Sequence, residues 1–381
     1  MNEKKITASS FLFVSVLAFF SGTISFFVVN IYGDILSVIL ALPIIIVVLF
    51  NFSSVLRLPV FIALLVLFAV YFLSTVTNGF DFAAIKNVLS IFIVMLFFSL
   101  GALYGQKFYK YRFSILFYLI IVAFYCLFFE MNRNKNALAL FLVFQALLLL
   151  LVFVLYSSKR VKKNLLFLSC SLFVLLMSTS LNVRSLLFLS LLFIIPLLIR
   201  EKRLTLIAIF SSSIIIVSLF MIYYLLTDIP IIEQMKVYSE VVSERNLNSG
   251  RQIIWPEYAA VIKNNLLFGV GAEYRMDFAY IGQNWSAHNT LLQVTSQVGI
   301  LGATIFCFIF LFTMKSTMKS VNKHPDLNNS TSIYLIAIFI GFLLIICFFE
   351  VTLFQNSHYM YIYQWLSLGV IYNYLINLRS N

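Results

Sequence analysis

Apolar stretches of about twenty residues recur along the whole 381-residue chain, and short polar links join nearly all of them. Each stretch is long enough to cross a hydrocarbon core about 30 Å thick as a helix. The composition agrees, because 62% hydrophobic and 10% charged residues with a mean hydropathy of +1.02 lie outside the range of soluble domains. The sequence therefore predicts an all-α polytopic membrane protein with one transmembrane domain, residues 1–381.

We expect about twelve transmembrane helices, each marked by one apolar stretch. Their predicted starts lie near Phe11, Ile35, Leu56, Ala83, Phe113, Asn136, Asn164, Ser185, Leu204, Thr290, Ser332 and His358. The four cysteines all fall inside these stretches and show neither a disulfide framework nor metal-ligand spacing.

Basic residues concentrate in every second link, which sets the predicted orientation. In the register that places the N-terminal Lys4 and Lys5 inside, 17 of the 26 Lys and Arg residues are cytoplasmic and 11 of the 14 Asp and Glu residues are external. Lysine and arginine are retained on the cytoplasmic side, so both termini are predicted to be cytoplasmic. The net charge of +12 then reflects membrane topology and anionic headgroups rather than nucleic-acid binding.

One polar segment, residues 228–288, interrupts this pattern between the ninth and tenth predicted helices. The alternation of cytoplasmic and external links places this segment outside as a large loop. It is the only place in the sequence large enough to build a polar site. Pro256 fits the first turn of a short helix, and Ile254, Tyr258 and Val261 approximate one apolar face. We therefore expect short amphipathic helices in this loop, together with part of an active site.

Two arginines on the external side are candidate anion ligands. Arg184 lies at the junction of the seventh and eighth predicted helices, and Arg251 lies four residues before Trp255 in the long loop. A guanidinium group presents a planar fork that suits phosphate oxygens. Two structural alternatives stay open: Arg184 could extend into the headgroups, and Arg251 could be incidental to a surface helix held by Trp255.

The pair His288-Asn289 directly precedes the tenth predicted helix, which places it at the external mouth of that helix. His288 is the best-placed general base on this side, although a capping or interface role is an alternative. Lys86 breaks the positive-inside pattern and is a weaker phosphate ligand candidate. Glu350 and His358 lie in the last external loop and could line an acceptor groove, but neither is assigned to catalysis.

Two arginines and a histidine suit glycosyl transfer from a lipid diphosphate. The sequence contains no glycine-rich phosphate loop and no Asp-x-Asp pair. A cationic clamp can stabilise a departing diphosphate, while a histidine removes the proton from an attacking hydroxyl. Donors of this kind reside in the membrane, as this chain does.

The order of these motifs resembles the bacterial O-antigen polymerase and O-antigen ligase superfamily. The resemblance covers about Ser178 to Phe310 and rests on the order of five short motifs rather than on any one of them. These motifs are Arg184 at a helix end, Gly250-Arg251-x-x-x-Trp255, Leu267-Phe-Gly269-Val-Gly271, His288-Asn289 and Gly299-Ile-Leu-Gly302.

This resemblance implies a glycosyltransferase of the bacterial inner membrane that works on the outer face, uses an undecaprenyl-diphosphate-linked glycan and needs no metal or cofactor. It suggests Arg184 and Arg251 as diphosphate ligands and His288 as the acceptor-activating base, with inversion at the anomeric carbon. Lys86, Trp255 and Asn289 are further substrate-binding candidates. A chain-length regulator and a flippase of the same pathway are the expected protein partners.

Three activities remain open at this point. We favour a polymerase of O-antigen or capsule type, which joins lipid-linked repeat units, because such polymerases are numerous and divergent. A ligase that transfers the glycan to lipid A-core uses the same leaving-group chemistry and is the alternative. A lipid-linked oligosaccharide flippase or other transporter is the rival from another class, but the predicted helices carry few of the mid-membrane charges typical of transporters.

Overall fold

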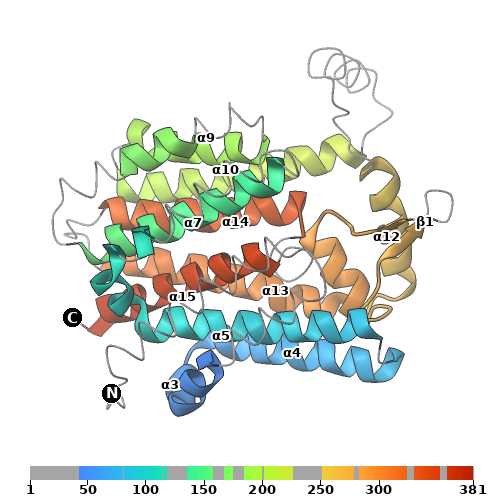
Figure 1. Cartoon of the computed structure of the whole chain (residues 1–381). Helices are drawn as coiled ribbons and strands as arrows, with labels where there is room; N and C mark the ends of the chain where they lie inside the picture. Colours follow the sequence, from blue (N-terminus) through green and yellow to red (C-terminus); the bar gives the residue numbers. More distant parts are fainter. Residues whose placement is uncertain are drawn as a thin grey trace.

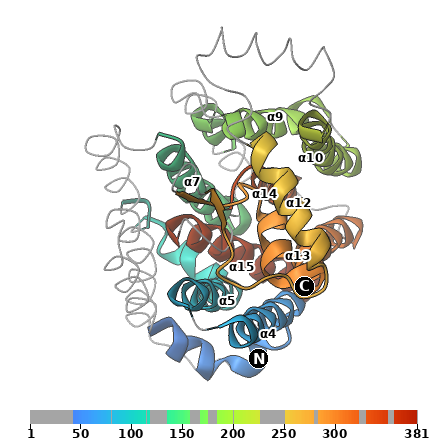
Figure 2. The same ribbon diagram turned by 90° about the vertical axis from the view of Figure 1, so that its right-hand side faces the viewer.

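The computed structural model is a bundle of long helices that lie alongside one another, with smaller elements across one end (Figures 1 and 2). The structure describes residues 43–79, 81–113, 115–117, 135–157, 167–174, 184–199, 201–225, 251–278, 283–323, 330–351 and 358–380. The predicted helix that begins near Phe11 lies outside these residues, as does the part of the long loop before residue 251; of the predicted helix that begins near Ile35, residues 43–50 are described and are helical.

Five helices in the described residues are long and apolar enough to cross a membrane. They are α4 (Pro59–Asn78), α5 (Phe82–Lys110), α7 (Lys135–Tyr156), α13 (Thr290–Lys323) and α14 (Ser330–Phe349). Two further helices, α9 (Arg184–Leu198) and α10 (Lys202–Leu225), contain shorter apolar segments, and α3 (Phe52–Val55) is a single turn before α4. The helical membrane-protein class is confirmed, while the total of about twelve helices remains a prediction.

Helix positions follow the hydropathy pattern closely. The helices α4, α5, α7, α9, α10, α13 and α14 begin within three residues of a predicted start. At the predicted starts near Phe113 and Asn164, the described residues 115–117 and 167–174 are helical. This agreement reflects a local property, because a long apolar stretch in lipid satisfies its backbone hydrogen bonds only within a helix or a closed barrel.

The last helix, α15 (His358–Ser380), differs from the prediction of an ordinary apolar membrane helix. It starts at the predicted residue but is not one of the five apolar candidates, since its sequence is rich in tyrosine and polar residues. It lies inside the bundle against α5 and α7, with Tyr361 and Trp365 fully buried. Gly101 of α5 and Gly369 of α15 allow close backbone contact, because a Cβ atom on either would overlap with the other helix.

Residues 251–278 and 283–285 form a small layer across one end of the bundle, here called the α12 end (Figure 2). Helix α12 (Arg251–Asn264) packs on α13, and strands β1 (Met276–Phe278) and β2 (Gln283–Trp285) form an antiparallel hairpin. The amphipathic helix was expected, but the hairpin was not. Strands of three residues are too short to produce a readable alternation of apolar and polar side chains.

The position of Pro256 also differs from the prediction. It is the sixth residue of α12 rather than a first-turn residue, because the helix begins at Arg251. Proline inside a helix removes one backbone hydrogen bond. Burial of Ile254, Trp255 and Tyr258 against Ala287 compensates, since this apolar face holds α12 on the bundle.

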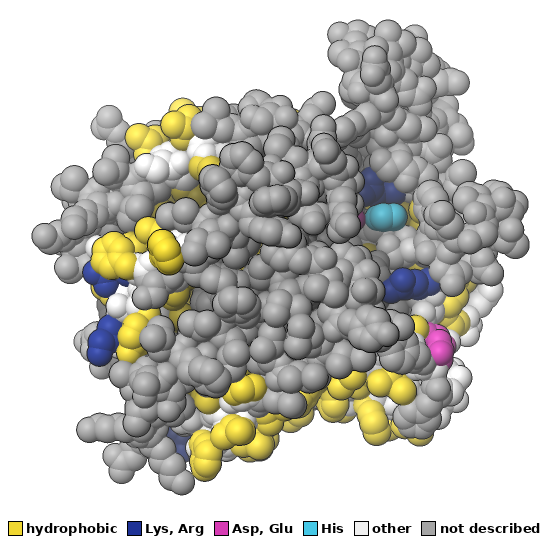
Figure 3. Space-filling model, in the orientation of Figure 1, with side chains coloured by type: hydrophobic (Ala, Val, Ile, Leu, Met, Phe, Trp, Pro, Cys, Tyr) yellow, Lys and Arg dark blue, Asp and Glu magenta, His cyan; other side chains and the backbone are white. Residues whose placement is uncertain are grey.

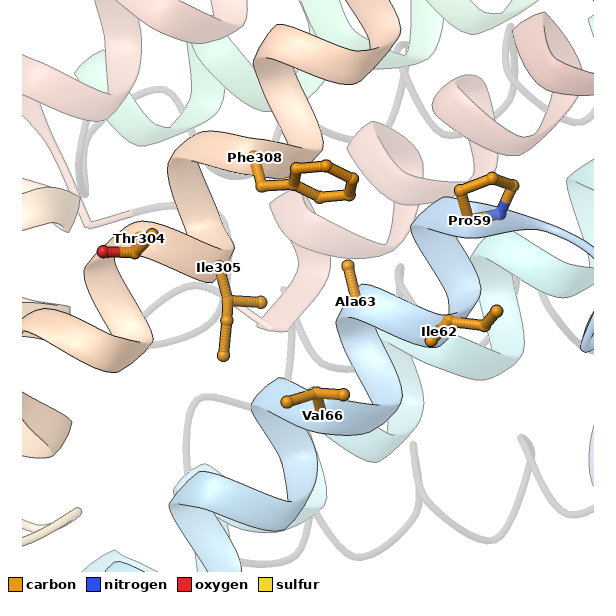
Figure 4. Close-up of a pocket in the computed structure, with 7 residues that line it drawn as sticks. All are labelled: Pro59, Ile62, Ala63, Val66, Thr304, Ile305 and Phe308. Atoms are coloured by element: carbon orange, nitrogen blue, oxygen red, sulfur yellow. The ribbon is translucent and has the colours of Figure 1, made fainter.

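A groove of about 380 Å³ lies between α4 and α13, in the membrane-spanning part of the bundle (Figure 4). Its lining is apolar apart from the hydroxyl of Thr304 and contains no titratable side chain. The side chains in Figure 4 come from both helices and leave the space between them open. This groove therefore offers no side chain suited to general acid–base chemistry.

Candidate active site

Arg251 joins α12 to the end of α14. Its Nη2 atom donates a hydrogen bond of 2.6 Å to the backbone oxygen of Phe349 and lies 3.7 Å from Oε1 of Glu350. The side chain is 11% exposed, and its Nε atom is buried without a hydrogen-bond partner. A buried guanidinium with an unused N–H group is a ready donor for an anion.

His288 lies directly before α13 and has a backbone φ of 46°. This left-handed conformation is unfavourable by about 1–2 kcal/mol for a residue with a side chain, and such strain is concentrated at functional sites. Its Nδ1 atom lies 3.3 Å from Oε2 of Glu350, and its side chain is 38% exposed. The imidazole is thus held on one side and accessible from the other.

Glu350 connects the two predicted site residues. One carboxylate oxygen faces Arg251 and the other faces His288, while Thr290 Oγ1 donates a 2.8 Å hydrogen bond to the Glu350 backbone oxygen. An ionised carboxylate only accepts hydrogen bonds, so a neutral His288 carries its proton on Nδ1. The Nε2 atom is then the basic nitrogen. Figure 3 shows a histidine side chain beside basic side chains at the α12 end.

Glu350 belongs to the candidate site, but the sequence alone did not identify it as a candidate catalytic residue. The sequence places it in the last external loop, where it could line an acceptor groove. The available signal was its place directly after the apolar α14, where an acidic residue meets the end of a membrane helix. Its pairing with Arg251 and His288, 99 and 62 residues away, could not be read from the sequence.

Two predicted substrate-binding residues make structural contacts. Trp255 Nε1 donates a 2.9 Å hydrogen bond to the Ala287 backbone oxygen and holds α12 against the segment before His288. Asn289 is 1% exposed, and its Oδ1 accepts a 3.0 Å hydrogen bond from the Leu292 amide. Asn289 is therefore the N-cap of α13. A substrate-binding role for either residue stays a prediction.

Arg184 and Lys86 are the two remaining predicted phosphate ligands. Arg184 is the first residue of α9, and its side chain lies outside the described residues. Lys86 lies near the start of α5 and is half-buried. Its neighbour Asn87 donates a 2.6 Å hydrogen bond to the backbone oxygen of Ala272, in the small layer at the α12 end. Lys86 is therefore at the α12 end, and its binding role stays a prediction.

A polar network below α12 fixes the segment before His288. Gln293 accepts hydrogen bonds at Oε1 from Tyr258 at 3.2 Å and from the Ala287 amide at 2.9 Å, and its Nε2 donates to the Tyr274 backbone oxygen at 2.7 Å. Burial, followed by the negative charge of Glu257, raises the pKa of Tyr274. These contacts limit the positions that His288 can take relative to α12.

The glycine-rich turn after α12 docks on α13. Gly269 and Gly271 have φ values of 67° and 127°, and a Cβ atom on Gly269 would overlap with the backbone of Gln297. Gln297 accepts at Oε1 a 2.9 Å hydrogen bond from Tyr71, and its backbone oxygen accepts one from Ser74 at 3.3 Å. The turn, α13 and α4 are thus held together beside the candidate site.

Among the described residues, no three His, Cys, Asp or Glu side chains lie close enough together to hold a metal ion. The charged part of the candidate site consists of one guanidinium, one carboxylate and one imidazole. This set can bind an anion through Arg251 and accept a proton at His288.

These features define the class: a polytopic helical membrane protein whose basic and proton-accepting side chains meet at one end of its bundle. Residues 165–307 match the model of a protein family described as O-antigen ligase. This segment contains Arg184, Arg251 and His288, and the match agrees with the resemblance to the O-antigen polymerase and ligase superfamily. It supports a function of that general type. A comparison with curated proteins gives no match.

Proposed function

We propose that the protein is a polysaccharide polymerase that transfers an undecaprenyl-diphosphate-linked glycan to the non-reducing end of another lipid-linked repeat unit. The observation that carries the proposal is the Arg251–Glu350–His288 cluster, which combines a buried cation with an oriented base. The superfamily match supports a lipid-linked saccharide as the substrate class. The charge asymmetry of the links supports a site on the outer face of the bacterial inner membrane.

In the proposed reaction, Nε2 of His288 removes the proton from an acceptor hydroxyl. The hydroxyl oxygen forms a bond to the anomeric carbon of the donor, and the bond from that carbon to the diphosphate oxygen breaks. The diphosphate leaves with the electron pair and retains its link to the polyprenyl chain. A single displacement of this kind inverts the anomeric configuration.

Arg251 supplies positive charge to the leaving diphosphate. Its buried Nε–H is the unused donor, while Nη2 is engaged by Phe349 and faces Glu350. A fixed donor in a water-poor site stabilises developing negative charge without reorganisation of solvent. Arg184 is proposed as a second diphosphate ligand, and Lys86 as a further contact.

Glu350 is proposed to orient the base. When it accepts a hydrogen bond from the Nδ1–H group, Nε2 is the nitrogen with the basic lone pair for the acceptor hydroxyl, and the negative charge of Glu350 stabilises the imidazolium that forms. In this arrangement Arg251 stabilises the leaving diphosphate, and His288 deprotonates the nucleophilic hydroxyl.

The test is a reconstituted assay with undecaprenyl-diphosphate-linked repeat units, with and without lipid A-core. We expect wild type to form a ladder of chain lengths without lipid A-core. We expect His288→Ala to abolish transfer while donor binding survives, because the base acts on the acceptor. Arg251→Lys should be severely impaired, since an ammonium group cannot reproduce the guanidinium fork.

The matched control for the arginine is Arg112→Lys. Arg112 lies two residues after the C-terminal end of α5, whereas the α12 end is at the start of α5, so this variant should retain activity. Product that forms only with lipid A-core would identify a ligase, the activity for which the matching family is described. Donor that merely changes leaflets without product would refute glycosyl transfer. Normal turnover by His288→Ala at saturating donor would remove His288 from catalysis.

A further inference from the structure

Three consecutive apolar residues after α12 are exposed at the α12 end of the bundle. Leu266, Leu267 and Phe268, here called the apolar tip, have exposed fractions of 50%, 63% and 76%. They lie in the turn between α12 and the hairpin, within the segment that hydropathy assigns to an external loop. Adjacent exposed apolar side chains of this kind mark a contact surface.

The apolar tip adjoins the exposed apolar side of a membrane helix. The Ile300 amide of α13 donates a 2.8 Å hydrogen bond to the Leu266 backbone oxygen, so the two segments touch. Ile300 and Leu301 are 45% and 47% exposed, in a helix that is long and apolar enough to cross a membrane. The apolar surface of α13 therefore continues onto the tip.

The exposure pattern along α13 locates the edge of this apolar surface. Residues 293–299 are all buried, and they include the polar side chains of Gln293, Ser296 and Gln297. Ile300 is the first exposed residue of the helix, followed by Leu301. The part of α13 from Gln293 to Gly299 is thus covered by protein, and the exposed apolar part of the helix begins beside the tip.

The backbone directly after the tip is hydrogen-bonded to protein. The Gly269 amide donates to the Asn265 oxygen at 2.9 Å, the Val270 amide to the Ser296 oxygen at 2.8 Å, and the Gly271 amide to the Gln297 oxygen at 3.1 Å. Irregular backbone is tolerated at membrane depth only where such groups are satisfied by protein. These bonds also hold the tip rigidly against α13.

Lys263, just before the tip, lies where it could contact lipid headgroups if the tip entered a membrane. Lys263 is exposed and precedes the tip by three residues, followed by the polar pair Asn264 and Asn265. A lysine beside an apolar segment extends its ammonium group toward phosphate while its methylene groups stay in contact with apolar surface. The order Lys, Asn, Asn, Leu, Leu, Phe matches a passage from headgroups into acyl chains.

We propose that the apolar tip, Leu266 to Phe268, is inserted among the acyl chains of the leaflet at the α12 end. The partner is the lipid bilayer, and Lys263 contacts its headgroups. Insertion anchors the C-terminal end of α12, the helix that begins at Arg251, at the membrane boundary. This inference concerns the position of the tip and holds whether or not the proposed glycosyl transfer is correct.

The test measures the depth of a fluorescent probe at Phe268. The full chain, with its four native cysteines replaced, receives the substitution Phe268→Cys, is labelled with an environment-sensitive maleimide and is reconstituted into phosphatidylcholine vesicles. Quenching is measured with acyl-chain nitroxide lipids and with aqueous iodide. Leu301→Cys is the lipid-facing control, and Ala259→Cys, on the exposed side of α12, is the aqueous control.

We expect the probe at position 268 to be quenched by nitroxide lipids as strongly as the probe at position 301, and by iodide several-fold more weakly than the probe at position 259. Iodide quenching equal to that at position 259 would show that the tip lies in water. Protection from both quenchers would show that protein, such as a second copy of the chain, covers it. Either result would overturn the proposal.

Discussion

Substitution of Gly299 by alanine should destabilise the protein through two separable effects. Helix α13 is interrupted at Val298 and Gly299, and Gly299 has φ 73° and ψ −170°, a conformation almost restricted to glycine. A Cβ atom here would also overlap with the backbone oxygen of Leu267, in the turn that docks on α13. Backbone held by hydrogen bonds cannot move aside as a flexible side chain can.

Gly79 separates the two effects, because it shares the backbone conformation and lacks the overlap. Its φ and ψ are 113° and 150°, and a Cβ atom would meet nothing within 4 Å. Gly79→Ala should therefore carry only the conformational penalty of about 1–3 kcal/mol. Gly299→Ala carries a similar penalty and also displaces the docked turn.

The additional loss can be worked from the contacts of that turn. Three backbone hydrogen bonds join it to α13, with donors Val270, Gly271 and Ile300. At a net contribution of about 0.5–1.5 kcal/mol each, their loss amounts to about 1.5–4.5 kcal/mol. We expect Gly299→Ala to lower the free energy of unfolding by that much more than Gly79→Ala does.

The assay is reversible unfolding of both variants in mixed micelles, followed by circular dichroism, with wild type as the reference. Limited proteolysis after α12 should be faster in Gly299→Ala than in Gly79→Ala, because the displaced turn is more accessible. Equal losses of stability in the two variants would refute the reasoning. It would mean that the contact between the turn and α13 contributes nothing beyond the backbone conformation of a single residue.

Two further predictions concern the candidate site. Glu350→Gln should lower kcat about tenfold to hundredfold, because it weakens charge-assisted contacts each worth about 1.5–3 kcal/mol. The control, Glu257→Gln on the exposed side of α12, should leave kcat unchanged. Equal rates in the two variants would contradict the orienting role. Asn289→Ala should lower the free energy of unfolding by about 1 kcal/mol through loss of the α13 N-cap, and Asn289→Ser should recover most of it. An unchanged unfolding free energy in Asn289→Ala would remove the capping assignment.

Some elements could be placed from the sequence because their cause is local. The starts of α4, α5, α13 and α14 follow from apolar stretches, and each is found within three residues of its predicted position. The turn at Gly269 was likewise readable, since glycine permits the positive φ and close approach found there. The β1–β2 hairpin was missed, because three-residue strands contain no usable pattern.

The roles of individual site residues were less accessible. Sequence reasoning selected Arg251 and His288 as polar residues on the predicted external side, and the structure brings both to Glu350. The sequence could not distinguish a substrate-binding role from a structural role for Trp255 and Asn289. In the structure, the hydrogen bond of Trp255 holds α12 and that of Asn289 caps α13. A residue type indicates which contacts are possible, and only packing decides which contact forms.

The sequence by itself determined the membrane class, the positions of the apolar helices and the segment that supplies Arg251 and His288, because hydropathy and charge act residue by residue along the chain. The tertiary structure alone decided that Glu350 lies between Arg251 and His288, and that the tip at Phe268 continues the apolar surface of α13. These features join segments that are distant in sequence. Their geometry depends on how the helices pack, through close contacts such as that between Gly299 and Leu267, and local composition does not encode it.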